Sequence, residues 1–211
     1  NFDTIPKNDS DVKLNCRETK EEFLKKIERI NKHIQLGDIY EMNYCQELFS
    51  KGCNINPSSV FWDLNLKSNA PFSVFSKMRN KYLLCSSPER FLQKSENKII
   101  SQPIKGTRKR GKNNQEDQEL IFDLQQSEKD RSENIMIADL VRNDLSRTAE
   151  KSSVKAEELC KIYTFDRVHQ MISTISSNLD EKYNFVDVLE TTFPMGSMTG
   201  APKIKSMELI E

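Results

Sequence analysis

Two short stretches place a lysine and a carboxylate where they could act together. Residues 103–107 read Pro-Ile-Lys-Gly-Thr, and residues 87–90 read Ser-Pro-Glu-Arg. Proline fixes the backbone before Lys105, and the glycine after it lets the backbone approach a ligand closely. An uncharged lysine is a nucleophile, and a partly buried Glu89 could protonate a leaving hydroxyl. Both stretches also fit solvated surface turns, where charged side chains are usually found.

A lysine must lose a proton before it can act as a nucleophile. From the ordinary lysine pKa of about 10.4, deprotonation costs about 4 to 5 kcal/mol at neutral pH. Nearby cations or burial reduce this cost, and three basic residues, 108–110, follow directly. Alternatively, residues 105–112 form a solvated basic loop. No aromatic residue interleaves there to stack on a base, so the stretch does not indicate nucleic-acid binding.

Asp130 and Glu133 are candidate metal ligands. They are three residues apart in a stretch of helical periodicity, so both carboxylates project from one face. Magnesium takes one or two protein carboxylates and completes its octahedron with substrate oxygens and water. Acidic residues at the start of a helix are also common because they complement the helix dipole.

Two other polar positions could line a site. His169 is one of two histidines and lies in an alternating segment, where a single histidine is more often structural than catalytic. Residues 196–202 concentrate small and hydroxyl residues before a helix, and their backbone N–H groups could hold an anion. The loop lacks the Gly-Lys-Ser pattern of a nucleotide-binding P-loop.

Strands and helices in mixed order must position these residues. Thr19 and Glu22 form a capping-box pattern, and apolar residues then recur at helical spacing until Gly37. A polar basic loop is predicted from 107 to 114. Strands are predicted at 40–49, 72–78, 81–86, 98–102, 162–165 and 168–178, and helices at 19–36, from 57, at 116–126, 129–141, 185–192 and from 203. The order lacks a steady strand–helix alternation and predicts an α+β fold.

Composition excludes several classes of protein. The 211 residues include 32 basic and 32 acidic side chains, so no net charge draws the chain to nucleic acid. No apolar run reaches the roughly 18 residues that cross a bilayer, and no membrane association is expected. Five cysteines without a Cys-x-x-Cys pair indicate a reducing, cytoplasmic setting. Residues 1–15 are predicted to be a linker or frayed end, and 16–211 one domain.

Taken together, these stretches resemble the chorismate-utilising enzymes, and within them the aminodeoxychorismate synthases of para-aminobenzoate and folate biosynthesis. The resemblance runs from about Cys16 to Glu211. Five ordered blocks carry it: 37–43, 87–91, 103–107, 129–134 continuing to 139–144, and 196–202. Enzymes similar to anthranilate synthase typically carry alanine at the position of Lys105.

The resemblance implies a covalent mechanism. The Lys105 amine adds to C2 of the chorismate ring while the C4 hydroxyl leaves, and ammonia then enters at C4 and expels the lysine. Glu89 becomes the acid that assists hydroxyl loss, and Glu133 with Asp130 becomes a Mg²⁺ site for the chorismate carboxylate. The substrate pocket is implied to contain Gly106, Thr107, His169, Ser197, Thr199 and Gly200.

We therefore expect an α+β chorismate-binding domain, with antiparallel sheets packed as a sandwich and helices outside. Relatives of this kind continue beyond the helix at 203 with apolar strands, a carboxylate-binding arginine and tyrosine, and another metal-binding glutamate. We expect 16–211 to be a C-terminally incomplete catalytic domain, inactive alone. The expected reaction is amination of chorismate at C4, with ammonia from a glutamine amidotransferase partner. The alternatives are synthesis of anthranilate, isochorismate or salicylate, or a non-catalytic scaffold that binds a ligand or regulates the amidotransferase.

Overall fold

Helix α1 (Lys20–Leu36) is the first helix in the computed structural model, which describes residues 12–211. The predicted capping box is confirmed. The Glu22 N–H donates to Thr19 Oγ1 at 3.2 Å, and the Thr19 N–H donates to the Glu22 carboxylate at 2.8 Å. Gly37, with φ +79°, follows the last turn. Most of the predicted linker, 1–15, lies outside the described residues.

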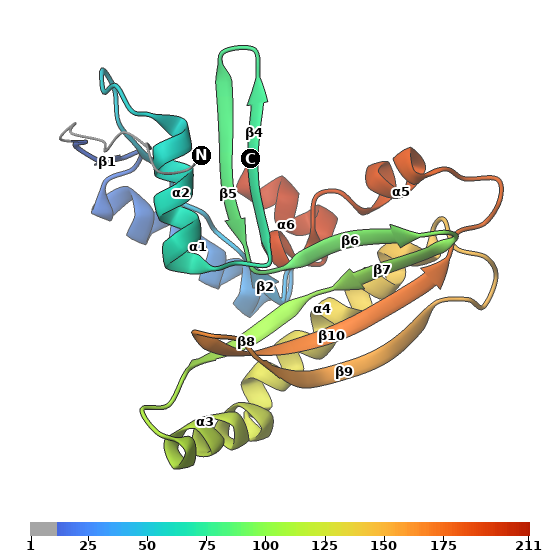
Figure 1. Ribbon diagram of the computed structural model, residues 1–211. Helices are drawn as coiled ribbons and strands as arrows, with labels where there is room; N and C mark the ends of the chain where they lie inside the picture. The colour runs from blue at the N-terminus through green and yellow to red at the C-terminus, as the bar shows by residue number, and fades with distance from the viewer. Residues whose placement is uncertain (1–11) are drawn as a thin grey trace, which may run out of the picture. The chain divides into compact units, whose positions relative to one another are not determined.

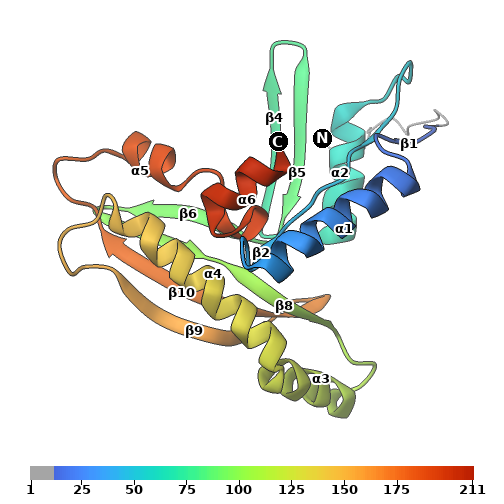
Figure 2. The ribbon, with the colours of Figure 1, turned by 180° about the vertical axis from the view of Figure 1, so that it is seen from behind.

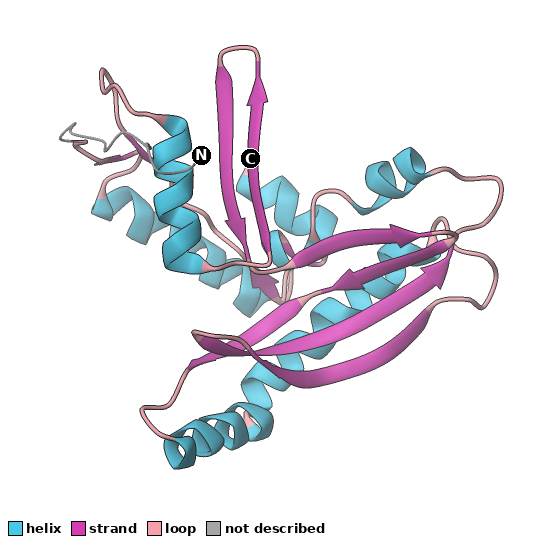
Figure 3. Ribbon diagram, viewed as in Figure 1, coloured by secondary structure: helices cyan, strands magenta, loops and turns pink. Residues whose placement is uncertain are grey.

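Contacts between residues divide the chain into two units, a division that composition does not reveal. The first unit takes in residues up to Glu28 together with Cys45–Glu89. Its strands β1 and β3 pair with each other, and β4 and β5 form a long antiparallel hairpin (Figure 3). The elements are the start of α1, then β1 (Asn15–Cys16), β3 (Leu48–Phe49), α2 (Pro57–Ser68), β4 (Phe72–Met78) and β5 (Lys81–Ser87).

The second unit takes in Arg29–Tyr44 and Arg90–Glu211. It contains a five-stranded antiparallel sheet, a small two-stranded ladder and most of the helices in the described chain (Figure 1). Its elements are β2 (Glu41–Met42), β6 (Arg90–Ser95), β7 (Lys98–Gln102), β8 (Ile104–Lys109), α3 (Asn114–Gln126), α4 (Glu128–Ser146), β9 (Lys155–Thr164), β10 (Val168–Asn178), α5 (Phe185–Thr192), the 3₁₀ turn η1 (Gly196–Met198), β11 (Gly200–Ala201) and α6 (Lys203–Ile210).

Strand β10 is the centre of the five-stranded sheet. Strand β9 pairs along one edge of β10, while β7 and β8 pair end to end along the other edge, and β6 pairs with β7. Pro103 separates β7 from β8 because it has no N–H to donate. Its carbonyl still accepts from the Ser173 N–H at 3.2 Å, so the two short strands follow β10 as one interrupted ribbon.

Helix α4 packs along one face of this sheet (Figure 2). Its apolar residues recur at spacings of three and four, which places them on one stripe. The buried cluster that joins helix and sheet contains Ile99, Ile137, Ala138, Val141, Leu145, Ile175, Leu179 and Val188. Burial of each large aliphatic side chain stabilises the fold by about 1.5 to 3 kcal/mol, so this cluster fixes α4 against the strands that carry the candidate site.

The expectation of an α+β fold built on antiparallel sheets is confirmed. Strand β10 and helix α5 have the predicted bounds. The predicted strand 40–49 is wrong, because the chain forms only the short strands β2 and β3 and passes from one unit to the other between them. The predicted loop after 107 is also wrong at its start, because Arg108 and Lys109 pair with β10.

Strand β6 was not predicted from the sequence. None of the helices in residues 12–211 combines the length and apolar character needed to span a membrane. All five cysteines lie within the described residues, and each is a free thiol.

Candidate active site

Lys105 lies at a bulge of β8 against the central strand. The pairs that flank the bulge are Thr107 with Gln170 and Ile104 with Ile172. Two residues of β8, Lys105 and Gly106, therefore stand opposite one residue of β10. A bulge of this kind re-aims a side chain out of the regular alternation of the strand.

Gly106 is required at the bulge for two reasons. Its φ of +92° is a conformation that residues with a side chain rarely adopt. A Cβ at this position would lie 2.9 Å from Asp130 Cβ and 3.0 Å from Leu124 Cδ1. The glycine thus lets α4 approach the backbone next to Lys105, while the close approach of this backbone to a ligand stays a prediction.

The Lys105 side chain is directed at a carboxylate, that of Glu41. Its Nζ lies 3.0 Å from Glu41 Oε1, and the two side chains are only 15% and 17% exposed. Glu41 belongs to the block 37–43, but no local pattern marks it as the partner of Lys105. The pair excludes the solvated-loop alternative for Lys105 itself.

The loop 196–202 positions the strand that carries Glu41. In the ladder of β2 with β11, Glu41 faces Ala201 and Met42 faces Gly200. A Cβ on Gly200 would lie 2.3 Å from the Glu41 carbonyl oxygen, so this close pairing requires glycine. The Asn43 side chain also donates to the Ser197 carbonyl at 2.8 Å. Lys105 and the loop are therefore brought together through β2.

The basic residues after Thr107 have carboxylate partners of their own. Arg108 Nε donates to Asp123 at 2.6 Å, and its Nη2 donates to Asp130 at 3.0 Å. Arg110 binds Asp117 through a guanidinium–carboxylate pair at 2.8 Å. The expectation that 108–110 act as a cationic cluster on Lys105 is not supported, because acidic residues of α3 and α4 compensate Arg108 and Arg110.

His169 is fully buried and both of its ring nitrogens have protein partners. Nε2 lies 2.9 Å from Asp117 Oδ1, and Nδ1 lies 2.9 Å from Thr164 Oγ1. The imidazole therefore links β10 to α3 and β9. Because side chains alternate along a strand, the next residue, Gln170, lies on the opposite face together with its partner Thr107.

Asp117 connects these partners. The Arg110 guanidinium and the Gly111 N–H hold the pKa of the Asp117 carboxyl well below its usual range, and His169 makes a smaller contribution in the same direction. Burial of the carboxyl raises the pKa and so offsets part of this lowering. A carboxylate that accepts several hydrogen bonds stays ionised. This network joins α3 to β9 and β10, and the only signal for it in the sequence is a histidine within a predicted strand.

Asp130 and Glu133 lie on the first turns of α4, as predicted, but their surroundings differ. Asp130 accepts from Arg108 and is largely buried, while Glu133 is about one-third exposed with Lys129 Nζ at 3.9 Å. Within residues 12–211, no cluster of three or more acidic, histidine or cysteine side chains has metal-binding geometry. Glu133 alone fits Mg²⁺ as a single carboxylate ligand, since that ion needs only one or two.

Loop 196–202 uses much of its own hydrogen-bonding capacity. The N–H groups of Met198 and Thr199 donate to the carbonyls of Met195 and Gly196 in η1, and the Thr199 hydroxyl bonds to the same two carbonyls. These two N–H groups are used within the turn, and anion binding by the rest of the loop stays a prediction. Ser197 is buried in the same turn.

Glu89 is the last residue of the first unit, in the turn between β5 and β6. The Ser87 hydroxyl accepts from the Glu89 N–H at 3.3 Å, which orders the turn. Lys105 belongs to the second unit, so the joint action of Glu89 and Lys105 stays a prediction.

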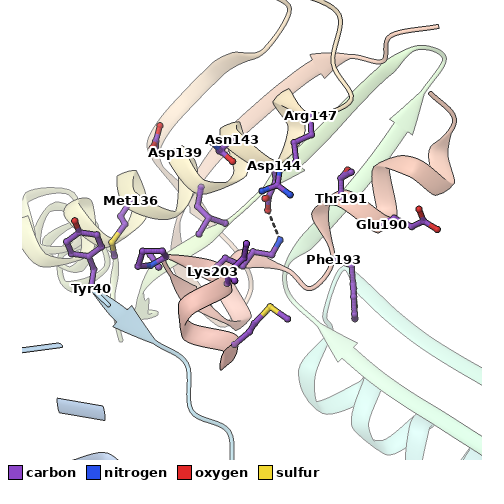
Figure 4. A pocket seen from close by; sticks show the side chains of 15 residues that line it. Tyr40, Met136, Asp139, Asn143, Asp144, Arg147, Glu190, Thr191, Phe193 and Lys203 are labelled. Atoms are coloured by element: carbon purple, nitrogen blue, oxygen red, sulfur yellow. Dashed lines mark hydrogen bonds and ion pairs between the residues drawn. The ribbon is translucent and has the colours of Figure 1, made fainter. Parts of the chain in front are cut away.

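A separate pocket of about 530 Å³ lies among α4, α5 and α6 (Figure 4). In it, Lys203 Nζ donates to Asp144 at 2.8 Å and to the Thr192 carbonyl at 2.6 Å. Burial raises the pKa of the Asp144 carboxyl, and Lys203 partly offsets that rise. Neither Lys105 nor Glu41 lines this pocket, so the ion pair ties α6 to α4 without forming part of the candidate active site.

Residues 1–211 match the family of chorismate binding enzymes, and the chain belongs to this family. The resemblance inferred from the sequence is thus confirmed.

Individual relatives show which members are similar. Aminodeoxychorismate synthase component 1 of Escherichia coli is 39% identical over 92% of the chain, which covers 42% of that protein. Anthranilate synthase component 1 of Aquifex aeolicus is 36% identical over 92% of the chain and 39% of that protein. The crystal structure of anthranilate synthase component I from Streptococcus pneumoniae superposes with a TM-score of 0.82 at 25% identity, covering 98% of this chain and 47% of that one. The chain spans less than half the length of these relatives.

Proposed function

We propose that this chain contributes the covalent part of an active site that aminates chorismate at C4, giving 4-amino-4-deoxychorismate for para-aminobenzoate and folate biosynthesis. Lys105 is the nucleophile, Glu89 is the acid for the leaving hydroxyl, and a glutamine amidotransferase provides the ammonia. The chain's similarity to proteins named aminodeoxychorismate synthase supports this choice of product.

The observation that carries the proposal is the placement of Lys105. Its amine is largely buried at a bulge next to Gly106, and its neighbour there is a carboxylate. A lysine that served only solubility would extend into water, as Lys109 does on the same strand with a 72% exposed side chain. Burial at a backbone irregularity is typical of a residue with a chemical role.

The proposed reaction has two halves. In the first, the neutral amine forms a bond to C2, the two ring double bonds shift, and the C4 hydroxyl leaves as water with a proton from Glu89. In the second, ammonia adds at C4, the double bonds shift back, and the C2 bond to lysine breaks. The ammonium formed at C4 returns a proton to Glu89, so protons and electrons balance.

Other residues of the chain would bind and orient the ring. Thr107 and Gln170 lie on the face of the sheet opposite His169, and they are candidates for contacts to the substrate. His169, Ser197, Thr199 and Gly200 act through the structure, by fixing β10 and the β2 ladder. Bound Mg²⁺ would neutralise the substrate carboxylate, with Glu133 as its protein ligand from this chain.

Amination at C2, giving anthranilate, is the second candidate. Relatives named anthranilate synthase are almost as similar, at 36% identity. Lys105 favours C4, because in the proposed chemistry the lysine occupies C2 while ammonia enters. A free C2 position would let ammonia enter there directly.

The experiment is product analysis with chorismate, Mg²⁺ and ammonium, using the protein expressed from its native reading frame. Mass and ultraviolet spectrum distinguish the products. We expect a C4-aminated product from the wild type and a loss of roughly 10³-fold or more in Lys105→Ala, since removal of a covalent nucleophile has effects of that scale or larger.

Lys109→Ala is the matched control, because Lys109 lies on the same strand but its side chain is exposed. Its one ion-pair contact among the described residues is a long one, with Nζ 4.0 Å from Glu116 Oε1. We expect it to keep the wild-type rate. Anthranilate as the wild-type product, or an unchanged rate and product in Lys105→Ala, would refute the proposal. Absence of any turnover by a folded, full-length protein would favour the scaffold alternative.

A further inference from the structure

The backbone around Glu41, the carboxylate next to Lys105, is held in place by hydrogen bonds. Glu41 lies on β2, and both sides of its backbone are held: the Tyr40 N–H donates to the Ala201 carbonyl at 2.7 Å, and the Asn43 N–H donates to the Thr199 carbonyl at 2.8 Å. The Ser206 hydroxyl reaches the Glu41 carbonyl from α6 at 3.4 Å. The place of Glu41 is thus fixed by backbone contacts and does not depend on its own side chain.

The Glu41 carboxylate has an unusual set of partners. Among the described residues, its buried Oε1 accepts no hydrogen bond of good geometry, although Lys105 Nζ lies 3.0 Å away. The Lys105 ammonium and the Glu41 carboxylate therefore attract each other by charge, but no N–H of the ammonium is aligned for a hydrogen bond. A small rotation of either side chain would align it, which leaves this oxygen able to receive a proton from the amine.

Within the described residues of the second unit, Glu41 is the acidic side chain that pairs with Lys105. Asp130, the acidic residue packed next to Gly106, accepts from Arg108 at 3.0 Å. From α4, Asn134 reaches only the Lys105 carbonyl, at 3.3 Å. Within this unit, Glu41 is thus the carboxylate in reach of the Lys105 amine.

We infer that Glu41 positions the Lys105 amine and accepts its proton, which makes the lysine nucleophilic. This inference rests on the proposed function. The N–H bond of the ammonium breaks and an O–H bond forms on Glu41, giving a neutral amine and a neutral carboxyl group. Exclusion of water from this largely buried pair by a bound substrate favours the neutral form, because an isolated ion pair is costly to desolvate. When lysine leaves C2, Glu41 returns the proton.

The test is Glu41→Gln in the full protein, with C4 amination followed at saturating chorismate. Glutamine keeps the shape of the side chain but cannot accept the proton. We expect kcat to fall at least about 100-fold, the typical effect of removing a proton-transfer group, with KM for chorismate changed less than about threefold. Thermal unfolding of the variant checks that it is folded.

A second variant separates proton transfer from packing. Glu41→Ala leaves space for a small carboxylate. We expect added formate to raise the kcat of this variant at least about tenfold. Formamide, which has a similar size but cannot accept the proton, should leave kcat unchanged. Glu157→Gln is the matched control, because it breaks a lysine–glutamate pair with Lys98 on the same sheet. We expect this control to keep the wild-type kcat.

The outcomes separate this inference from the proposed function. Wild-type kcat in Glu41→Gln, or a higher one, would overturn the role of Glu41 while C4 amination stood, because the carboxylate would then only hold the ammonium. Equal rescue by formate and formamide would do the same. A wild-type product aminated elsewhere would instead refute the proposed function itself.

Discussion

Asn134 shows how a single buried amide holds the bulge that carries Lys105. Its side chain is fully buried on α4, and its Nδ2 donates to the carbonyls of Met171 at 2.9 Å and Lys105 at 3.3 Å. Its Oδ1 accepts from the Ser173 hydroxyl and from the Cys160 thiol. The bulge interrupts the regular ladder, and this amide satisfies carbonyl groups on both strands at that point.

We predict that Asn134→Asp destabilises the protein by about 3 kcal/mol, because a buried and a partly buried carbonyl lose their donor and face a carboxylate. Chemical denaturation measures the change. Asn143→Asp, at an exposed position of the same helix, is the control and should change the free energy of unfolding by less than about 0.5 kcal/mol. A loss equally small for Asn134→Asp would show that the bulge does not depend on this amide.

Helix α3 is attached to the sheet by polar contacts at Asp117. The carboxylate accepts from Arg110 at 2.8 Å and from the Gly111 N–H at 2.6 Å, and His169 reaches it from β10. These donors hold the pKa of Asp117 in the folded protein below its ordinary value of 3.8. The attachment is therefore sensitive to acid.

The sign of the pH effect follows from that shift. A depressed pKa contributes stability that is complete above the ordinary value and is lost as the pH falls toward the folded-state value. We predict that Asp117→Asn lowers the melting temperature at pH 7, and that the gap to the wild type narrows steadily below about pH 4. Glu119→Gln, at an exposed position of the same helix, is the control and should change the melting temperature at pH 7 only slightly. A gap independent of pH would contradict the network.

Elements were predictable from the sequence where local signals agreed with the fold. Helix α5 begins at a capping box, with Asn184 accepting from the Asp187 N–H and Asp187 accepting from the Asn184 N–H. Strand β10 is a long apolar and hydroxyl run, and it has the predicted bounds. The basic residues of β8 by themselves indicate a loop, but this segment forms a strand because it pairs with β10. Tertiary pairing overrode local propensity there.

The candidate site was predictable by residue type but not by partner. Lys105 and Gly106 are recognisable from their pentapeptide, and the resemblance assigned their roles. Glu41 could not be found, because its contact with Lys105 depends on a ladder between β2 and β11, strands of two residues each. The partners of His169 could not be predicted either, because the contact of its ring with Asp117 of α3 depends on strand register.

Across the whole molecule, the blocks that carry the resemblance are unevenly divided. Blocks 37–43, 103–107, 129–134 with 139–144, and 196–202 fall in the second unit, and only 87–91 includes residues of the first. The second unit therefore holds the proposed nucleophile Lys105, its carboxylate partner Glu41 and the magnesium candidate Glu133. Because the chain spans 42% of its E. coli relative, activity is to be tested in the protein encoded by the native reading frame.

The central claim is a covalent bond between Lys105 and the substrate ring, and mass spectrometry of the digested protein tests it most directly. The protein is incubated with chorismate and Mg²⁺ in the absence of ammonia, so that the second half of the reaction cannot occur. We predict an added mass of chorismate less one water on the peptide that contains Lys105, and its disappearance when ammonium is added. Formation of the C4-aminated product at the wild-type rate by Lys105→Ala protein, which cannot form this bond, would contradict the account.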